Sequence, residues 1–272
     1  MKQRVHVLDL EFDPLKESEV LSQIDQAISS KRRLSFRYVK PYVVFFRSAH
    51  RDESIRSAIN SADLVIADGV SAQWAASYLA DDNHSLWLWL RSIFVSMRND
   101  AWLTRIIPER GAGVDTTHQL LLRAAQNGWR VGVLGGRDPK RIEQSLLERY
   151  PLLQIGGVWS GYFAPRTESK LLQRIADTKL DLLFVALGHP KQEVFMQVNR
   201  QRGLARVLIG EGGTFDYDEM GGSLKRAPQW MRRVGLEWLW RILMRPADIR
   251  KSTAIIPFMW RVYLTGRNKK LH

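Results

Sequence analysis

Four segments that contain glycine each follow a short apolar run of strand length. They begin at Asp68, Gly135, Gly188 and Gly210. Glycine at such an exit lets backbone N–H groups approach a phosphate closely, and a following helix adds its positive end. In any single loop the glycine could instead simply permit a tight turn. Four of these exits in one chain favour a site for a nucleotide or a nucleotide sugar.

Asp68 stands at the end of an apolar run, between Ala67 and Gly69. A carboxylate in this place can take a proton from a substrate hydroxyl. It can equally cap the helix that starts near Ser71. Position alone leaves both roles open for Asp68.

Two carboxylates, Asp216 and Asp218, have the D-x-D spacing by which many sugar transferases hold a divalent metal on a diphosphate. Two oxygen ligands are fewer than such an ion normally takes, and an Asp-rich turn explains the pair as well. Arg110, Lys191 and the glycine loops could receive a departing diphosphate without a metal. The six histidines are dispersed, so we expect no metal and no cofactor.

Three familiar nucleotide or hydrolase motifs are missing from the chain. No G-x-x-x-x-G-K-[ST] loop occurs, and Gly132 to Gly136 lacks the G-x-G-x-x-G spacing of dinucleotide sites. No G-x-S-x-G elbow supports a serine hydrolase. A nucleotide-dependent oxidoreductase is therefore disfavoured.

Apolar runs and helix-period stretches alternate along the chain. The expected strands are residues 5–10, 63–67, 131–134, 180–187 and 206–209, and the expected helices are 17–29, 54–61, 115–126, 139–150, 168–177 and 192–202. This alternation predicts an α/β fold, a Rossmann-like parallel sheet with helices on both faces. We expect a catalytic domain over residues 1–215 and a basic, amphipathic, helical C-terminal appendage over 216–272.

The positive charge of the chain is concentrated at its C-terminal end. Residues 225–272 hold twelve Lys and Arg against two acidic residues, which is +10 of the net +13. Met231, Val234, Trp238 and Ile242 recur at helical spacing beside arginines. Docking on the body would satisfy that apolar face, but the arginines favour an anionic membrane. Nucleic acid is an alternative partner for the basic segment, but the pattern resembles no common groove-reading module, so we expect no nucleic-acid binding.

Residues 86–95, which include Trp87 and Trp89, are unusually apolar for a connection. They fit either a core helix or a flap that faces a membrane. No apolar run reaches the roughly 18 residues that span a bilayer, and the first residues lack the core of a signal peptide. We expect a cytoplasmic protein that lies on the inner face of the cell membrane without crossing it.

Several motifs together resemble the WecG/TagA/CpsF glycosyltransferase family. They are LGHPKQE at 187–193, GGTFD at 212–216, KRAPQWM at 225–231, GLEW at 235–238, ADLVIADG at 62–69, Arg110 with Gly113 and Asp115, LGG at 134–136 and GYF at 161–163. They occur in order over most of the chain. Members of this family include bacterial N-acetylmannosaminyltransferases that build surface polymers such as teichoic acid linkage units.

The resemblance implies an inverting, metal-independent transfer from a UDP-sugar, typically UDP-N-acetylmannosamine, to an undecaprenyl-diphosphate-linked amino sugar. Asp68 matches the proposed catalytic base, Arg110 an active-site arginine, and Lys40 stands where a catalytic threonine is usual. The expected donor-binding residues are Gly69, Asp115, Gly135, Gly136, Tyr162, Gly188, Lys191, Gln192, Glu193, Gly213, Phe215 and Asp216. The expected membrane- or acceptor-binding residues are Trp87, Trp89, Arg226, Trp230, Arg232, Arg233, Trp238, Arg241 and Arg245. A homo-oligomer is compatible with the family.

The chain departs from the family pattern in two places. The usual Thr-x-Asn falls on Lys40-Pro41-Tyr42, so Lys40 either grips the diphosphate or is a solvated side chain at a strand end. The stretch from Asp68 to Arg110 is also longer than usual. A different donor, a different lipid acceptor, or a non-catalytic protein that binds nucleotide sugars or nucleic acid would each fit these departures.

Overall fold

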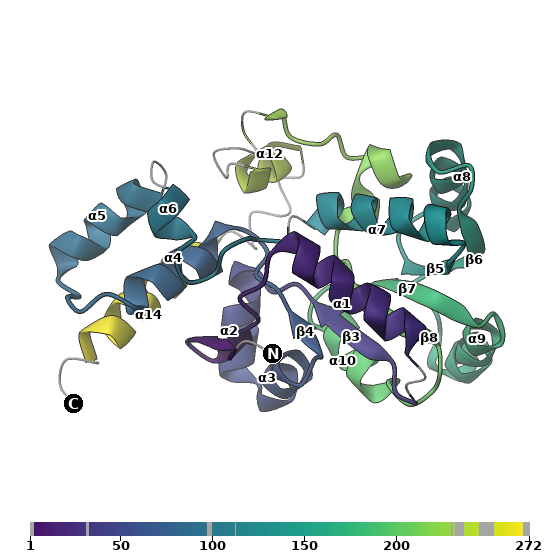
Figure 1. Cartoon of the computed structure of the whole chain (residues 1–272), viewed down its shortest axis with the longest axis horizontal. Helices are drawn as coiled ribbons and strands as arrows, with labels where there is room; N and C mark the ends of the chain where they lie inside the picture. The colour runs from purple at the N-terminus through teal and green to yellow at the C-terminus, as the bar shows by residue number, and fades with distance from the viewer. Residues whose placement is uncertain are drawn as a thin grey trace.

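The computed structural model describes residues 3–30, 33–96, 100–111, 113–229, 231, 237–244 and 253–268. Its centre is a six-stranded sheet in the order β4-β3-β8-β7-β5-β6, in which every neighbouring pair is parallel (Figure 1). The strands are β3 (Phe36–Val39), β4 (Leu64–Val65), β5 (Arg130–Gly135), β6 (Gln154–Trp159), β7 (Leu180–Ala186) and β8 (Ala205–Gly210). The expectation of a parallel α/β sheet is confirmed.

Helices cover both faces of this sheet. One face packs on α1 (Glu17–Ser29), α7 (Gly113–Asn127) and α8 (Pro139–Arg149). The other packs on α2 (Val43–Arg51), α9 (Pro165–Asp177) and α10 (Lys191–Val198), and α4 (Val70–Leu79) extends the same apolar cluster away from the sheet. Strand β7 contributes side chains to the cores on both faces of the sheet. Leu182 and Phe184 lie in the core on the first face, and Leu183 and Val185 in the core on the second. This is why the strands are apolar without alternation.

The first apolar run does not join the main sheet, so that sequence expectation is wrong. β1 (Val5–Val7) and β2 (Leu10–Phe12) instead form a separate antiparallel pair. Leu8 between them has a positive φ of 54°, which closes the turn. Charged residues on both sides of the turn left this hairpin without a clear signal.

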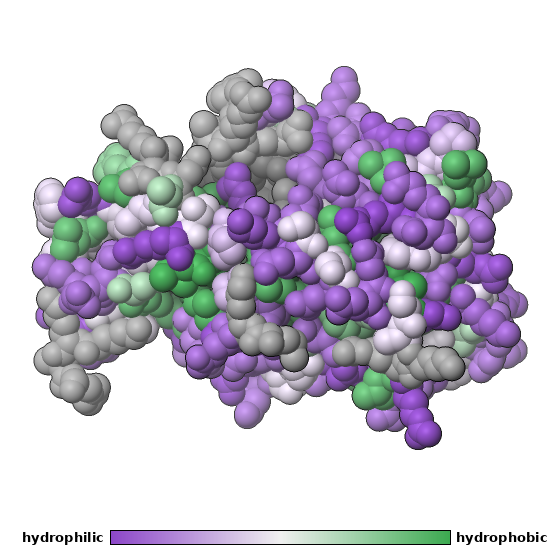
Figure 2. Space-filling view, viewed as in Figure 1, coloured by the Kyte–Doolittle hydropathy of each residue, from purple (hydrophilic) through white to green (hydrophobic). Residues whose placement is uncertain are grey.

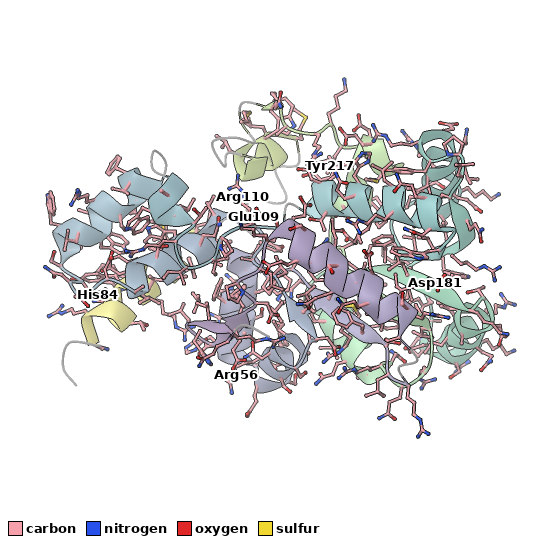
Figure 3. All side chains as sticks on the ribbon, in the orientation of Figure 1. Arg56, His84, Glu109, Arg110, Asp181 and Tyr217 are labelled. Carbon is pink, nitrogen blue, oxygen red and sulfur yellow. The ribbon has the colours of Figure 1, made fainter. Side chains whose placement is uncertain are left out.

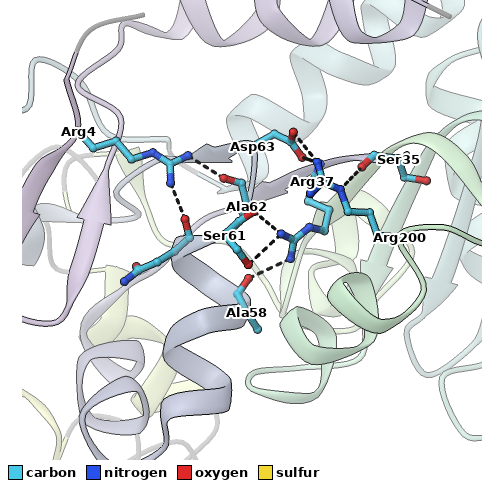
Figure 4. Close-up of polar contacts among 9 residues, drawn as sticks. Arg4, Ser35, Arg37, Ala58, Ser61, Ala62, Asp63 and Arg200 are labelled. Atoms are coloured by element: carbon cyan, nitrogen blue, oxygen red, sulfur yellow. Dashed lines mark hydrogen bonds and ion pairs between the residues drawn. The ribbon is translucent and has the colours of Figure 1, made fainter. Parts of the chain in front are cut away.

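A buried arginine ties β3 to its neighbours. Arg37 is 1% exposed and donates to the carbonyl oxygens of Ala58 and Ser61, while its own backbone N–H donates to Asp63 (Figure 4). Arg200, after α10, donates to both carboxylate oxygens of Asp63 at 2.7 and 2.8 Å. Burial is the main reason that the pKa of Arg37 falls to about 10. The cluster joins β3, α3 (Glu53–Asn60), the start of β4 and the end of α10.

Four helices form a lobe at one end of the molecule, at the left in Figure 1. They are α4, α5 (Leu86–Ser96), α6 (Asp100–Leu103) and α14 (Ile255–Asn268). Phe258 of α14 packs on Phe46 and Trp74, with ring centroids 4.6 and 6.2 Å apart. Arg261 pairs with Asp9 at 2.7 Å. This part of the basic C-terminal segment is therefore packed against the body, and α12 (Glu237–Met244) is its other described helix.

Candidate active site

Strand order brings three sequence-distant loops together. Because β4, β3 and β8 are neighbours and parallel, the residues that follow them lie at one edge of the sheet. These are Asp68 after β4, Lys40 after β3 and Glu211 after β8. The backbone N–H of Asp68 donates to Pro41 at 2.9 Å, which fixes the first two loops to each other.

The N-terminus of α7 meets this cluster. The point where a Cβ on Gly113 would stand lies 3.6 Å from Thr214 Oγ1 and 3.9 Å from both Asp68 Oδ2 and Lys40 Nζ. The positive end of a 15-residue helix therefore faces a carboxylate, an ammonium and a hydroxyl. Helix termini of this kind bind anionic groups. The cluster can hold a negatively charged substrate beside a group that accepts a proton.

Lys40 is not a solvated side chain. Its Nζ lies 2.5 Å from Glu211 Oε1, and the two side chains are 4% and 0% exposed. The ammonium also lies over the ring of Tyr38, 5.5 Å from the centroid. Burial first, and then the charges of Glu211 and Asp68, raise the pKa of Tyr38 well above its ordinary value. The floor of the site is therefore a buried ion pair beside a neutral phenol.

Arg110 is half-buried next to this floor. The backbone N–H of Gly111 donates to Ala67 at 2.9 Å, which anchors the arginine beside the Asp68 loop. With Tyr38 and Thr116, Arg110 lines a cavity of about 10 Å³, which is room for about one water. Figure 3 shows Arg110 between α4 and α7. The structure thus brings the Arg110 segment to the same edge of the sheet as Asp68 and Lys40.

The glycine loops form the other half of the edge. They follow β7, β5 and β6, which are neighbours in the sheet. Gly135 has a φ of +132°, and a Cβ there would stand 2.3 Å from the carbonyl oxygen of Ala186, so only glycine fits. Gly136, Gly188 and Tyr162 lie in the same three exits, and Tyr162 is 83% exposed. Lys191 lies over the ring of Phe163 at 5.0 Å, which connects the β6 and β7 exits.

Several expected donor residues support loops instead of facing open space. Gln192 is buried and accepts a hydrogen bond from the backbone N–H of Gly212 at 2.9 Å. Glu193 is fully buried and bonds to His189 at 2.9 Å, and His189 contacts Ser48 of α2. These contacts shape the exits of β7 and β8.

The loop after β8 runs through two short 3₁₀ turns, η1 (Thr214–Asp216) and η2 (Asp218–Met220). Phe215 is 1% exposed and packs on Phe184 in the core, so its role is packing. Gly213 caps η1, Asp216 is half-buried, and Asp218 is exposed. Within the described ranges, no three acidic, histidine or cysteine side chains gather as metal ligands.

Asp115, in the first turn of α7, pairs with Arg226 at 2.7 Å. Arg226 also approaches Glu219 at 3.6 Å and is 11% exposed. An expected donor residue and an expected membrane residue are thus bonded to each other.

Gly69 has a φ of +82° at the start of α4, with open space around it.

The remaining membrane expectations divide between α5 and the C-terminal segment. Trp87 is 66% exposed, whereas Trp89 is partly buried and donates to the carbonyl oxygen of Met259 in α14 at 3.1 Å. Trp238 and Arg241 belong to α12, but their side chains lie outside the described part. Trp230, Arg232, Arg233 and Arg245 lie outside the described residues. No helix in the described ranges is both long and apolar enough to cross a bilayer.

Sequence reasoning missed Glu211, Thr214 and Tyr38. Glu211 carries the same signal as Asp68, a carboxylate directly after a buried apolar strand. Tyr38 belongs to β3, which the sequence did not predict because Arg37 and Lys40 interrupt its apolar run. Only the pairing of β3 with β4 and β8 brings these side chains to the site.

A Rossmann-like sheet with a carboxylate, cations and glycine exits at one edge fits an enzyme that acts on an activated, phosphate-bearing substrate. The model of the Glycosyl transferase WecG/TagA/CpsF family matches residues 5–86 and 97–271. The chain therefore belongs to this family and is a glycosyltransferase of cell-surface polysaccharide synthesis. Residues 87–96, most of α5, are the internal stretch that the family model leaves unmatched.

Proposed function

We propose that the protein transfers a sugar from a UDP-sugar, N-acetylmannosamine or a close relative, to an undecaprenyl-diphosphate-linked amino sugar. The observation that carries this proposal is the meeting of Asp68, Lys40 and Thr214 at the N-terminus of α7. An acceptor hydroxyl beside Asp68 can lose its proton to the carboxylate. The resulting oxygen is then positioned to attack the anomeric carbon of a donor whose diphosphate is held by cations and amides.

The bond changes follow from this placement. The acceptor oxygen forms a bond to the anomeric carbon from the side opposite the leaving group, and the bond to the diphosphate oxygen breaks. UDP leaves with the electron pair, and the configuration inverts. In this proposal Arg110, Lys191, the exit amides and the α7 N-terminus stabilise the developing negative charge, so no metal is required.

Lys40 supports the same chemistry from below the site. Lys40 Nζ and Asp68 Oδ2 both lie 3.9 Å from the Cβ position of Gly113, and Glu211 holds Lys40 in place at 2.5 Å. Lys40 takes the position of the threonine in the family's usual Thr-x-Asn, and Tyr42 that of the asparagine. We propose that the replacement alters donor preference and leaves the reaction type unchanged.

The partners of the enzyme follow from the same proposal. A polyprenyl acceptor resides in a bilayer, and the basic C-terminal segment supports binding to the anionic inner face of the cell membrane. Direct contact with nucleic acid is not part of the proposal. A screen of UDP-sugars with a lipid-linked amino sugar acceptor would identify the donor.

Replacing Asp68 with Asn tests the assignment of the base. We expect transfer to fall by about 10²- to 10⁴-fold, the usual contribution of a general base, while UDP binding measured by calorimetry is retained. Asp218→Asn is the matched control, because Asp218 is exposed at the second position of the D-x-D pair. It should retain activity, also in the presence of EDTA. Full turnover by Asp68→Asn would remove this role, and loss of activity with EDTA would remove the metal-free mechanism.

A further inference from the structure

Helix α5 presents a stripe of large apolar side chains to solvent. Trp87, Leu90 and Phe94 are 66%, 45% and 66% exposed, and their spacing of three and four residues puts them on one side of the helix. The other side is occupied, since Ser92 accepts a hydrogen bond from Trp74 of α4 at 3.0 Å. The stripe is thus the outer side of a helix whose inner side is packed. It lies in the ten residues that the family model does not match.

Helix α14 presents a second stripe of the same kind. Ile256, Trp260 and Leu264 are 78%, 49% and 39% exposed at four-residue spacing, while Phe258 and Val262 are buried against the body. These three residues and the three of α5 are called the lobe surface below. Space-filling colours show apolar residues interleaved with polar ones over this lobe (Figure 2).

Aromatic contacts join the two helices. The Trp89 ring of α5 lies 6.3 Å from Trp260 and 5.8 Å from Tyr263, measured between centroids. Its indole N–H donates to the carbonyl oxygen of Met259 at 3.1 Å. Trp260, the middle residue of the α14 stripe, takes part in this contact and is itself half-exposed. The two helices that carry the stripes are therefore in contact through Trp89, and both pack on α4.

The two segments that carry the lobe surface contain positive charges and no acidic residues. Residues 83–99 and 253–272, which contain α5 and α14, include six Lys and Arg and no Asp or Glu. The guanidinium of Arg91 lies over the ring of Trp87, 5.6 Å from its centroid. Of these cations, Arg261 pairs with Asp9. Exposed tryptophan with aliphatic neighbours and a net positive charge is the composition of elements that lie at the boundary of headgroups and acyl chains.

We propose that α5 and α14 together bind an anionic bilayer, with the lobe surface inserted at the level where headgroups meet acyl chains. A second copy of the chain is a poorer occupant, because each copy carries a net charge of +13 and would present the same basic surface. An anionic lipid surface satisfies both the apolar stripes and the charge. In this protein the ten residues that the family model leaves unmatched are thus part of a lipid-binding element.

The position of the lobe deepens the proposed function and rests on it for the identity of the acceptor. Helix α4 runs from Gly69, next to Asp68, into the lobe. Its ten residues span about 15 Å at 1.5 Å per residue. A bilayer held by α5 and α14 would therefore bring a membrane-anchored acceptor within reach of the carboxylate.

Vesicle flotation of the full chain, without any substrate, tests the proposal. The probe is a vesicle of phosphatidylglycerol and phosphatidylcholine, compared with phosphatidylcholine alone. The variant replaces Trp87, Leu90 and Phe94 with Ser. We expect its partition coefficient on anionic vesicles to fall by about tenfold or more, because three apolar side chains no longer enter the bilayer.

The matched control replaces Leu122, Leu147 and Leu152 with Ser. These leucines are 36%, 43% and 78% exposed over α7, α8 and the turn after α8, away from the lobe. The control should float like the unmodified chain. All six changes are at exposed positions, so circular dichroism should show both variants folded. As a second readout, Trp87→Phe should reduce the quenching of protein fluorescence by vesicles with brominated acyl chains.

Equal flotation of the lobe variant and the unmodified chain would overturn the proposal. So would a dimer in analytical ultracentrifugation that the lobe variant dissociates, because the surface would then bind a second copy. The experiment also separates this inference from the proposed function. Lipid binding without sugar transfer would remove the proposed function alone, and transfer to a detergent-solubilised acceptor without lipid binding would remove this inference alone.

Discussion

We expect the buried ion pair of Lys40 and Glu211 to affect the free energy of unfolding of the protein. Lys40→Met leaves a carboxylate that is 0% exposed without its counterion, and the other oxygen of Glu211 already has no hydrogen-bond partner within the described residues. Breaking such a pair from one side costs about 3–5 kcal/mol. We therefore expect Lys40→Met to lower the free energy of unfolding by that amount.

The double variant gives the sharper result. Replacing Lys40 with Met and Glu211 with Leu removes both charges, so no ion is left unpaired in the core. Such replacements are often neutral or stabilising by about 1–4 kcal/mol. The double variant should therefore be more stable than Lys40→Met alone. Equilibrium urea unfolding of both single variants and the double variant measures the coupling energy.

An exposed ion pair of the same chain is the control. Arg56 and Glu53 are 3.4 Å apart with side chains 37% and 86% exposed, so Arg56→Met should cost no more than about 0.5 kcal/mol. The reasoning is refuted if the two single changes at the buried pair add up to the double change within about 0.5 kcal/mol, which is the result for independent sites. It is also refuted if Lys40→Met is no more harmful than Arg56→Met.

Two further predictions concern the docking of α14. Burial alone would raise the pKa of Asp9, but Arg261 more than offsets this and the pKa is lowered from 3.8. The stability from this pair is therefore present above pH 3.8 and is lost as the pH falls below it, by up to about 1 kcal/mol. Asp9→Asn should make the melting temperature fall less steeply as the pH is lowered below 3.8. An unchanged pH dependence would contradict this. Gly266→Ala should lower the free energy of unfolding by about 1–3 kcal/mol, since the new Cβ would stand 2.4 Å from buried His84. The control Asn268→Ala, at an exposed position of the same helix, should leave it unchanged. Equal melting temperatures of the two variants would show that α14 shifts to make room for the Cβ.

Much of the fold was predictable from the sequence because the signals are local. Helix α1 begins and ends where its apolar period predicts, and β5, β7 and β8 coincide closely with continuous apolar runs. Strands β3 and β6 were missed for identifiable reasons. β3 contains the buried Arg37, and β6 contains Gly156 and Gly157, which weaken a strand pattern.

The candidate site was predictable in part. Asp68 and the glycine exits were visible because parallel strands present their carboxyl ends at one edge. The partner of Lys40 could not be predicted from the sequence, because Glu211 lies 171 residues away. The two side chains meet only because β3 pairs with β8 in the sheet. Arg226 with Asp115 is a second case, in which two expected binding residues proved to be bonded to each other.

The amino-acid sequence by itself determined the fold class, the family resemblance and the concentration of positive charge, because period, motif order and charge are properties of the chain. The tertiary structure decided which side chains meet and which faces remain exposed. Gln192 and Glu193 became buried loop supports, and the two sides of α5 became one packed and one exposed. The physical reason is that burial and ion pairing depend on contacts between distant elements, and local sequence carries no record of those contacts.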